Sequence, residues 1–488
     1  MVKDNSDNND FHKSLSSEKL DFKTKLAYGA GDLGPAITAN IAVFYMMVFF
    51  TNVAGIPAGL AGSILMIGKI WDGINDPMVG MLTDKTQSRR WGRRLPWLLY
   101  GAIPFGFFFF LQWIVPQFTA DKSVNIWCLF WYYVVIGIVS QAFFTVVNLP
   151  YTAMTPELTQ DYDERTSLNS FRFTFSIGGS ILSLILSKII FSQIGDRQQQ
   201  YLVLAAVCTV ISVLSLYWCV YGVRDRILAF EAKRISLPQE AEIPFLEQLK
   251  IVFSNKPFLF VIAIYLFSWL GVQITASIIP YFVVNCMKLK EGDVPTVMIA
   301  VQGTALFMLF IWSYLSKKIG KKIVYFLGMS SWIIAAAGLF FLQPNQIGLM
   351  YVMAIMAGVG VSTAYLIPWS MIPDVIELDE LQTGQRREGI FYGFMVLLQK
   401  FGLAFGLFLV GNTLQAYGFK EAVAGQSSLP IQPESALLAI RIAVGPIPTV
   451  CLIAGLVLVY FYPITREMHA EIMLKLQAQR EDINTQKP

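Results

Sequence analysis

The sequence predicts an all-α membrane protein with twelve transmembrane helices, arranged as two six-helix halves in a parallel repeat. Apolar runs of about twenty residues recur along the whole chain, which is the length that crosses a bilayer as a helix. Only 14% of the 488 residues are charged, against about 25% in an average soluble domain. One long charged connection lies midway and separates six runs from six.

Each apolar run can cross a hydrocarbon core of about 30 Å at about 1.5 Å per residue. The runs are 26–50, 60–82, 97–115, 126–154, 171–191, 201–222, 258–282, 296–315, 323–342, 347–373, 390–413 and 436–463. We therefore expect a cytoplasmic tail, a six-helix bundle, a cytoplasmic linker, a second six-helix bundle and a cytoplasmic tail, over 1–25, 26–222, 223–257, 258–463 and 464–488. The linker contains a short amphipathic stretch, IPFLEQLKIVF, and the first tail lacks the apolar core of a signal peptide.

The positions of Lys and Arg predict the orientation. With the N-terminus placed inside, the cytoplasmic segments carry 27 of these residues and the outer loops carry 5. Since cytoplasmic loops collect positive charge, both termini are expected to be cytoplasmic. The other five cations lie inside predicted spans: Lys69, Arg172, Lys188, Lys400 and Arg441.

The two halves echo each other at two places. TDKTQSRRWGRR after the second span corresponds to SKKIGKKI after the eighth, and NLPYTAMTPEL to LIPWSMIPDVI at the ends of the fourth and tenth. Offsets of roughly 220–230 residues indicate a parallel duplication, the layout of major-facilitator transporters with a cavity between halves. The alternative for either echo alone is convergence, with basic residues in cytoplasmic turns and Pro at helix ends.

Three of the 33 acids lie inside predicted spans: Asp32, Asp72 and Asp76. A carboxylate at bilayer depth costs about 2.5–3.5 kcal/mol, so it should face a cavity or a partner. Asp72 and Asp76 are one turn apart in GKIWDGINDP, so both carboxylates leave the same helix face. Because oxygen ligands suit hard cations, we expect Asp72, Asp76 and Asn75 to bind Na⁺, or the pair of carboxylates to bind H⁺.

Two lysines are expected to act with this pair. Lys69 precedes Asp72 by three residues and could hold the carboxylates without an ion, or compete with the ion. Lys400 lies about ten residues into the eleventh span and is predicted to reach Asp72 or Asp76 across the cavity. The alternatives are a Lys–Asp bridge that only joins helices, and snorkelling of Lys400 to the interface.

Polar and aromatic side chains near the predicted cavity suggest a substrate site. Asp32, in YGAGDLG, either contacts the cation or the eleventh span, or caps a helix. Arg172 either bonds a polar substrate or anchors at headgroups. Aromatic rings beside hydroxyls and amides suit a sugar ring, and also an interfacial belt. The expected substrate-binding residues are Asp32, Asn148, Thr152, Arg172, Tyr365 and Trp369.

Charged clusters between spans suggest cytoplasmic gates. DYDERTSLNSFR pairs acids with Arg165, and RRWGRR lies close to Asp84. Such clusters are expected to form salt bridges that hold the halves together on the inner side, or to be ordinary helix-end charges. The predicted gating residues are Lys69, Asp84, Arg93 and Arg165.

These motifs together resemble the glycoside–pentoside–hexuronide:cation symporters: KIWDGINDP followed by SRRWGRRLPW, with YGAGDLG, NLPYTAM, DYDERTSLNSFR, IPWSMIPDVIE and the span-11 lysine. The resemblance implies a twelve-helix major-facilitator fold in a bacterial inner membrane and sugar uptake coupled to Na⁺, Li⁺ or H⁺. It places Asp72 and Asp76 at the cation site, with Lys69 and Lys400 at its basic positions. It also places Arg172 at the sugar site.

The chain differs from that family at the positions that bind the hydroxyl groups of the sugar. Ala36 and Asn148 stand where sugar-binding aspartates are found, and Thr152 stands in place of a stacking Trp. Cation coupling is thus expected to transfer, whereas galactoside specificity is not. IPWSMIPDVI also resembles an animal branch that moves lysophospholipids, so an amphiphilic substrate is the alternative.

Other function classes are disfavoured. The histidines, His12 and His469, lie in the tails and no nucleophile–base set is present, so we expect no enzyme. No basic domain suggests nucleic acid, and five cysteines, mostly in apolar runs, do not make a disulfide scaffold. We expect a monomer in the lipid bilayer, with a small-molecule substrate, Na⁺ or H⁺ as coupling ion, and no cofactor.

Overall fold

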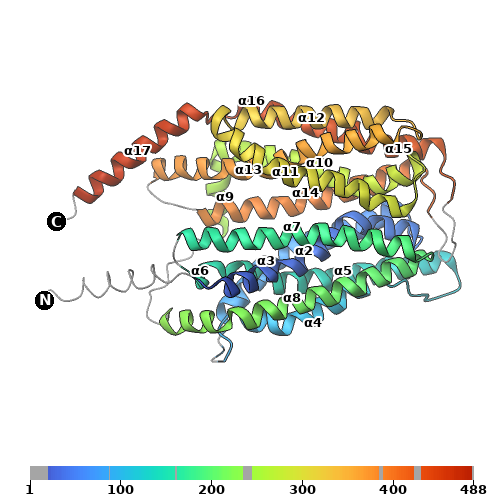
Figure 1. Ribbon diagram of the computed structural model, residues 1–488, viewed down its shortest axis with the longest axis horizontal. Coiled ribbons are helices and arrows are strands. Elements are labelled where there is room, and N and C mark those ends of the chain that lie inside the picture. The colour runs from blue at the N-terminus through green and yellow to red at the C-terminus, as the bar shows by residue number, and fades with distance from the viewer. Residues whose placement is uncertain are drawn as a thin grey trace. The chain divides into compact units, whose positions relative to one another are not determined.

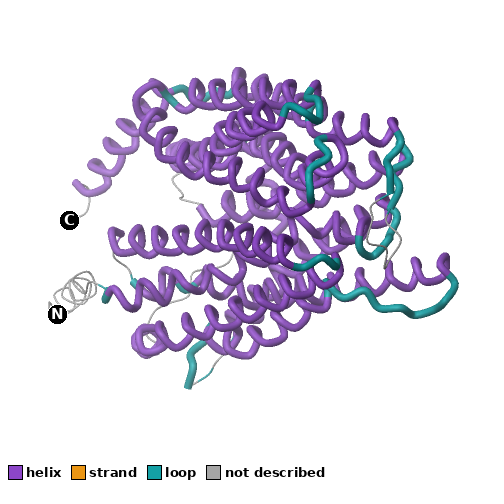
Figure 2. Tube along the Cα trace, turned by 45° about the vertical axis from the view of Figure 1, so that its right-hand side comes forward, coloured by secondary structure: helices purple, strands orange, loops and turns teal. Residues whose placement is uncertain are grey.

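The computed structural model describes residues 20–485, except 87, 89, 160, 161, 235–244, 384–387 and 422–429. All regular structure in these residues is helical, and no strand occurs among them (Figure 2). The chain forms two compact units. Unit 1 lies within Met1–Ile56, Ile67–Gln239 and Ala422–Leu429, and unit 2 within Pro57–Met66, Glu240–Glu421 and Pro430–Pro488.

Unit 1 is a helical bundle around an aromatic and aliphatic core. In it, α2 packs against α7 and α8, and α4 packs against α5 and α8 (Figure 1). Tyr28, Phe105 and Tyr151 are among the large side chains of this core. Its helices are α2 (Phe22–Asn52), α3 (Ala58–Lys85, whose first turns belong to unit 2), α4 (Leu95–Leu111), α5 (Lys122–Ala153), α6 (Thr155–Leu158), α7 (Tyr162–Gln193) and α8 (Arg197–Arg234).

Unit 2 is a second bundle, in which α10 packs against α14 and α16, and α12 packs against α13 and α16. Phe258, Tyr325 and Trp332 belong to its core. Its helices are α9 (Phe245–Ser254), α10 (Lys256–Tyr281), the π-helical η1 (Phe282–Cys286), the 3-10 turn η2 (Glu291–Asp293), α11 (Val294–Ile319), α12 (Lys321–Phe341), α13 (Ile347–Thr383), α14 (Glu388–Ala416), α15 (Glu434–Val444), α16 (Pro446–Phe461) and α17 (Arg466–Thr485).

The described helices account for the predicted membrane spans. Ten are long and apolar enough to cross a membrane, and Leu95–Leu111 is a shorter apolar helix. Helix α3 is not among the ten, because Lys69, Asp72 and Asp76 lie in its middle. Each of the predicted ranges overlaps a described helix, so the all-α architecture is confirmed for the described residues.

Several helices differ from the predicted spans in their bounds: α7 begins at Tyr162 rather than 171, and α8 ends at Arg234 rather than 222. The span predicted over 436–463 corresponds to Glu434–Phe461, which consists of two helices, α15 and α16, that meet at Gly445 and Pro446, where Pro lacks the N–H that would continue the helix. Helix α13 extends to Thr383, ten residues beyond its predicted end at 373. The amphipathic stretch of the linker is helical, as α9.

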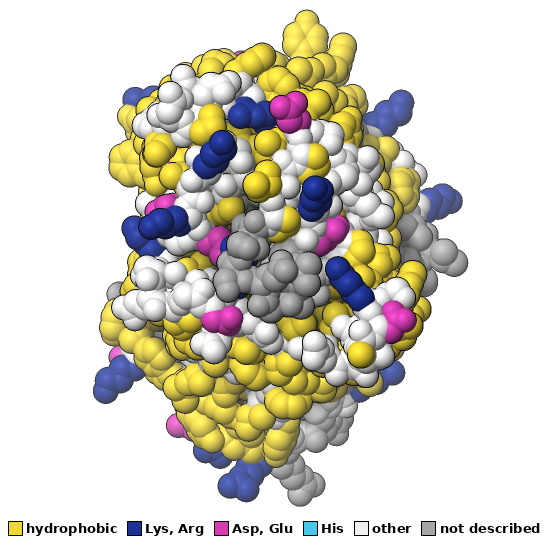
Figure 3. Space-filling view, turned by 90° about the vertical axis from the view of Figure 1, so that its right-hand side faces the viewer, with side chains coloured by type: hydrophobic (Ala, Val, Ile, Leu, Met, Phe, Trp, Pro, Cys, Tyr) yellow, Lys and Arg dark blue, Asp and Glu magenta, His cyan; other side chains and the backbone are white. Residues whose placement is uncertain are grey.

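Helix α5 begins at a side-chain cap. Asp121 Oδ1 accepts hydrogen bonds from the Ser123 N–H at 2.8 Å and the Val124 N–H at 3.2 Å. These bonds and the Ser123 hydroxyl lower the pKa of Asp121, because they stabilise the charged carboxylate. Figure 3 looks along the helices and shows Lys, Arg, Asp and Glu among polar side chains, with hydrophobic side chains toward the flanks. That distribution is expected where helix ends meet water.

Candidate cation and substrate sites

Helix α3 carries a row of polar side chains at helical spacing, at positions 69, 72, 75 and 76. Asp72 is only 2% exposed, Asn75 is buried and Asp76 is half-buried. The expectation that both carboxylates share one face is met, because one side chain of α5 contacts both of them.

That side chain is Thr145. Its hydroxyl oxygen lies 3.1 Å from Asp72 Oδ1 and 3.1 Å from Asp76 Oδ1. The two carboxylate oxygens are thus no farther apart than twice that distance. A hydroxyl has one proton to donate, so at any moment it serves only one of the two carboxylates. The arrangement gathers oxygen ligands from two helices, which is the donor set that a hard cation prefers.

Lys69 lies beside this group. Its ammonium is 3.8 Å from Asp72 Oδ2 and 3.4 Å from Gln141 Oε1 on α5. The predicted proximity of Lys69 and Asp72 is therefore confirmed. The formal charges of Lys69, Asp72 and Asp76 sum to −1, which one monovalent cation would balance.

Two further groups could complete a coordination sphere. Asn75 is buried and could offer its amide oxygen, the atom of that side chain that can coordinate a cation, while its side-chain nitrogen makes no hydrogen bond in the described structure. Pro77 lies inside α3 and cannot donate to the carbonyl of Gly73, one turn earlier. Sequence reasoning identified the residues of α3 but missed Thr145 and Gln141, the polar residues that α5 contributes.

Two predicted substrate residues contact each other in unit 1. Arg172 Nε on α7 lies 3.4 Å from Asp32 Oδ2 on α2, and Asp32 is buried. The Arg172 guanidinium also lies 5.9 Å from the centre of the Tyr151 ring, which stacks on Tyr28 at 5.0 Å. The capping alternative for Asp32 is wrong, because α2 begins at Phe22 and Asp32 lies inside it.

The two predicted substrate residues of α5 are half-buried. Asn148 and Thr152 are one turn apart near the end of the helix. The Thr152 hydroxyl donates to the Leu149 carbonyl at 2.9 Å, within its own helix. Their contact with a solute therefore stays a prediction.

In unit 2 the two predicted aromatic residues belong to a larger cluster. Tyr365 on α13 meets Trp269 of α10, with ring centres 5.5 Å apart. Trp369 meets Tyr265 at 6.0 Å and stacks on Tyr392 of α14 at 6.1 Å. The Trp269 indole N–H is buried without a hydrogen-bond partner. The cluster offers ring faces and a donor, which suits a ligand with an apolar face and polar groups.

Lys400 lies in the middle of α14 and is half-buried. Its predicted approach to Asp72 and Asp76 would join the two units and stays a prediction.

One predicted gating residue forms a buried ion pair. Arg93 Nη2 is 2.6 Å from Glu157 Oε1, and Arg94 Nη1 is 3.1 Å from the same oxygen. Glu157, which sequence reasoning missed, is only 4% exposed in the short helix α6. The backbones of Asp84 and Arg165 lie on helices, but their side chains lie outside the described residues.

Unit 2 has a comparable pair. The Lys321 ammonium lies 2.7 Å from both carboxylate oxygens of Asp374 and donates to the Ser370 carbonyl at 2.6 Å. Lys321 belongs to SKKIGKKI and Asp374 to LIPWSMIPDVI, the two segments that echo unit 1. The repetition of these two segments in both halves was therefore a sequence signal for the Lys321–Asp374 pair.

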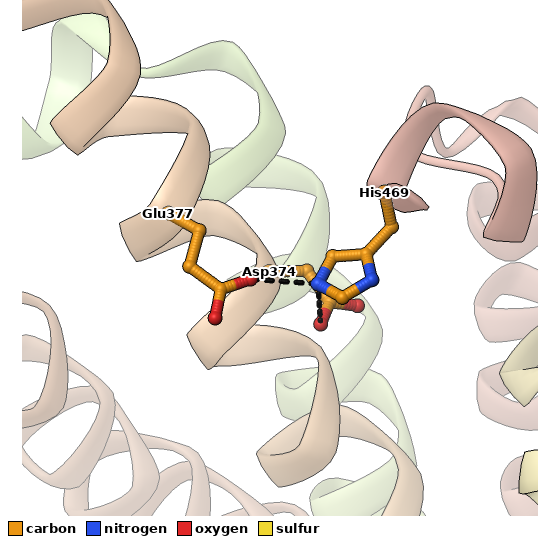
Figure 4. Close-up of side chains that lie close together, drawn as sticks. All are labelled: Asp374, Glu377 and His469. Atoms are coloured by element: carbon orange, nitrogen blue, oxygen red, sulfur yellow. Dashed lines mark hydrogen bonds and ion pairs between the residues drawn. The ribbon is translucent and has the colours of Figure 1, made fainter. Parts of the chain in front are cut away.

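Asp374 also takes part in a cluster with Glu377 and His469 (Figure 4). His469 Nε2 lies 2.6 Å from Glu377 Oε2 and 3.5 Å from Asp374 Oδ1, which joins α17 to α13. The three donor atoms lie within 4.8 Å of one another, a spacing that could hold a metal ion. Because Lys321 already contacts both oxygens of Asp374, the cluster is better described as an ion-pair network.

Comparison with known proteins settles the family. The family model described as MFS/sugar transport protein matches residues 27–466. The chain belongs to that family. It is thus a multi-pass protein of the major facilitator superfamily, whose members are transporters rather than enzymes.

Relatives and solved structures agree with this. An uncharacterized symporter of Synechocystis sp. is 52% identical, over 96% of this chain and 99% of that protein. The mouse sodium-dependent lysophosphatidylcholine symporter 1 is 27% identical, over 96% of this chain and 90% of that protein. The crystal structure of the nucleoside transporter NupG covers 90% of this chain and all of that chain, with a TM-score of 0.63 and 13% identity, which supports the fold alone.

Proposed function

We propose that the chain is a symporter that couples Na⁺ influx to uptake of a sugar or related polar solute by alternating access. The observation that carries the proposal is the oxygen cluster of Asp72, Asp76 and Thr145. Its setting in a membrane-spanning bundle is the reason to regard it as functional, because intramembrane carboxylates are kept where they serve transport.

Electrostatics favours a cation at this cluster. Two carboxylates whose nearest oxygens are at most about 6 Å apart repel each other by on the order of 3 kcal/mol or more at an effective dielectric constant of about 20. Lys69 offsets part of this repulsion, and a monovalent cation would offset the rest. Each charge that moves down a 100 mV potential releases about 2.3 kcal/mol, enough for tens-fold accumulation of a solute.

The order of helix packing supports the proposed parallel repeat. The contacts α2–α7, α2–α8, α4–α5 and α4–α8 of unit 1 correspond in chain order to α10–α14, α10–α16, α12–α13 and α12–α16 of unit 2. In alternating access, two halves that share the same order of helix packing rock about a central site. We also propose the finer assignment to the glycoside–pentoside–hexuronide:cation symporters, on the motifs of the sequence.

The aromatic cluster of α10, α13 and α14 is the proposed wall for the solute in unit 2, and Arg172 with Asp32 is the proposed polar contact in unit 1. A sugar would stack on the rings and bond the polar groups. The second candidate is a lysophospholipid or another amphiphile, favoured by the similarity to the mouse lysophosphatidylcholine symporter and by Ala36 and Asn148, which replace carboxylates.

The two candidates are separated by transport into proteoliposomes. Labelled glycosides and labelled lysophosphatidylcholine are offered with an inward gradient of Na⁺, Li⁺ or H⁺. A sugar symporter accumulates a glycoside only with the cation gradient. Uptake of the lysolipid without uptake of any glycoside would refute the sugar proposal and support the second candidate. Equal uptake with and without every gradient would refute cation coupling.

We further propose that the protein works as a monomer in a bacterial inner membrane, with both termini cytoplasmic and the coupling ion as its only inorganic partner. The support for orientation is the distribution of 27 Lys and Arg residues against 5.

A further inference from the structure

We propose that Gln141 is a positioning residue of the cation site. Its side-chain oxygen holds the ammonium of Lys69 beside the aspartate pair and so keeps the carboxylates available to the coupling ion. Without this acceptor, Lys69 would move onto the carboxylates and compete with the ion. The inference rests on the proposed function of the α3 cluster and extends it to what determines the affinity of the cluster for the cation.

Helices α3 and α5 meet through polar side chains in matching register. Gln141 and Thr145 are one turn apart on α5, so they lie on one face of that helix. Gln141 contacts Lys69, the first residue of the polar row on α3, and Thr145 contacts Asp72 and Asp76 farther along the row. One face of α5 therefore places a neutral acceptor beside the ammonium and a hydroxyl beside the two carboxylates.

The ammonium of Lys69 is shared between two oxygens. It lies 3.4 Å from Gln141 Oε1 and 3.8 Å from Asp72 Oδ2. Both distances exceed the range of about 2.7–2.9 Å that is typical of a strong charge-assisted hydrogen bond. Because a lysine side chain is a flexible aliphatic stem, a short movement toward α3 would turn the contact with Asp72 into a direct ion pair.

The position of this charge matters because the site is shielded from water. The Asp72 side chain is only 3% exposed, and that of Lys69 is 23% exposed. Charges that are buried to this degree are screened less than charges on the surface. An ammonium that bonds Asp72 would therefore occupy an oxygen that the ion needs and would repel the ion itself.

A glutamine is well suited to hold this lysine. Its amide oxygen accepts a hydrogen bond from the ammonium but carries no formal charge. Gln141 therefore leaves the formal charge of Lys69, Asp72 and Asp76 at −1, which a monovalent cation balances. It also adds no carboxylate that would bind the ammonium permanently.

The test is equilibrium binding of radioactive Na⁺ to the purified full-length protein. Gln141→Leu removes the acceptor at similar size, and Lys69→Met removes the charge but keeps the aliphatic stem. The double variant combines both changes, and Gln141→Glu keeps an acceptor of the same shape. Gln199→Leu, the same substitution at an exposed position of α8, is the matched control. Thermal unfolding midpoints establish that each variant is folded.

We expect Gln141→Leu to weaken Na⁺ binding about tenfold, because the ammonium loses an acceptor and moves onto Asp72. Lys69→Met should bind Na⁺ at least as tightly as the original protein, because the competing charge is gone. In the double variant the loss of Gln141 should have no further effect, since the two residues act through one contact. Gln141→Glu should not weaken binding, and Gln199→Leu should bind as the original protein does.

Equal Na⁺ affinity in Gln141→Leu and the original protein would overturn the positioning role and leave the proposed function intact. A loss of the same size in the Lys69→Met background would also overturn it, because Gln141 would then act on the site without the lysine. Weaker binding in Gln141→Glu would do the same. An original protein that binds no Na⁺ would refute the sodium site together with this inference.

Discussion

The hydroxyl of Thr145 determines how the two aspartates of α3 can be satisfied. It lies 3.1 Å from an oxygen of each carboxylate but has one proton to give. Lys69 is 3.8 Å from Asp72, a longer and therefore weaker contact than a direct hydrogen bond. A cation that binds among these groups would be coordinated by oxygens already held on two helices, with little rearrangement.

Thr145→Val tests the contribution of that hydroxyl, because valine keeps the shape and removes the oxygen. Loss of one oxygen ligand should weaken apparent Na⁺ affinity about tenfold, by analogy with a hydrogen bond to a charged group. The measurement is the Na⁺ concentration that gives half-maximal uptake. The control is Thr174→Val, an exposed residue of α7 whose hydroxyl bonds its own helix at 2.8 Å, which should leave that concentration unchanged. An unchanged Na⁺ dependence in Thr145→Val would remove this residue from the site.

Arg172→Gln should leave Asp32 as a buried carboxylate without its cation. The expected loss is about 3 kcal/mol of unfolding free energy, because breaking a buried pair exposes the full desolvation cost of the remaining charge. The double variant Asp32→Asn with Arg172→Gln should regain most of that loss. Thermal unfolding in detergent measures both. Equal stability of the single variant and the original protein would show that the pair contributes nothing to stability.

At the scale of the helix, close packing of α2 depends on glycine. A Cβ added at Gly31 would lie 2.4 Å from Tyr151 Cε2 and 2.8 Å from Cys219 Sγ, distances that side chains do not adopt without shifting. Tyr151 in turn donates to the Tyr28 carbonyl at 2.7 Å, so it is not free to move away. The YGAGDLG motif thus has a structural role beside that of Asp32.

Gly31→Ala should therefore destabilise unit 1 by about 1–3 kcal/mol through overpacking. Gly137→Ala is the control, because nothing lies within 4 Å of the Cβ that it would add, and helix propensity alone favours alanine. The comparison is made from thermal unfolding midpoints. A Gly31→Ala protein as stable as the Gly137→Ala protein would contradict the packing argument.

Ion pairs near helix ends compensate the buried carboxylates that these helices carry. Asp374 lies beyond the predicted end of its span, yet α13 continues through it because Lys321 compensates the carboxylate. Glu157 is buried beside Arg93 and Arg94 in the same manner. Apolar periodicity predicts where helices lie but gives no information about a partner on another helix.

For the whole molecule, the distribution of Lys and Arg predicts that both termini face the cytoplasm. Peptide tags added at the N- and C-termini should be cleaved by a protease only after right-side-out membrane vesicles are opened. A tag inserted after Gln117, in the predicted outer connection between α4 and α5, should be cleaved in intact vesicles. The opposite pattern would invert the topology.

The sequence predicted the helices and the aspartate pair because both leave a local pattern. The separation of α15 from α16 could also have been predicted, because Gly445 and Pro446 are residues that interrupt helices. The sequence did not predict Thr145, Glu157 or His469 as partners, since each contacts side chains 63 to 95 residues away along the chain. Such contacts follow from tertiary packing, which a local pattern does not encode.

The most direct test of the central claim is equilibrium binding of radioactive Na⁺ to the purified protein. The original protein should bind Na⁺ saturably, and Asp72→Asn and Asp76→Asn should each abolish that binding while the protein stays folded. Asp225→Asn, at an exposed position of α8, is the matched control and should bind normally. Undiminished Na⁺ binding in both aspartate variants would contradict the claim that this pair holds the coupling ion.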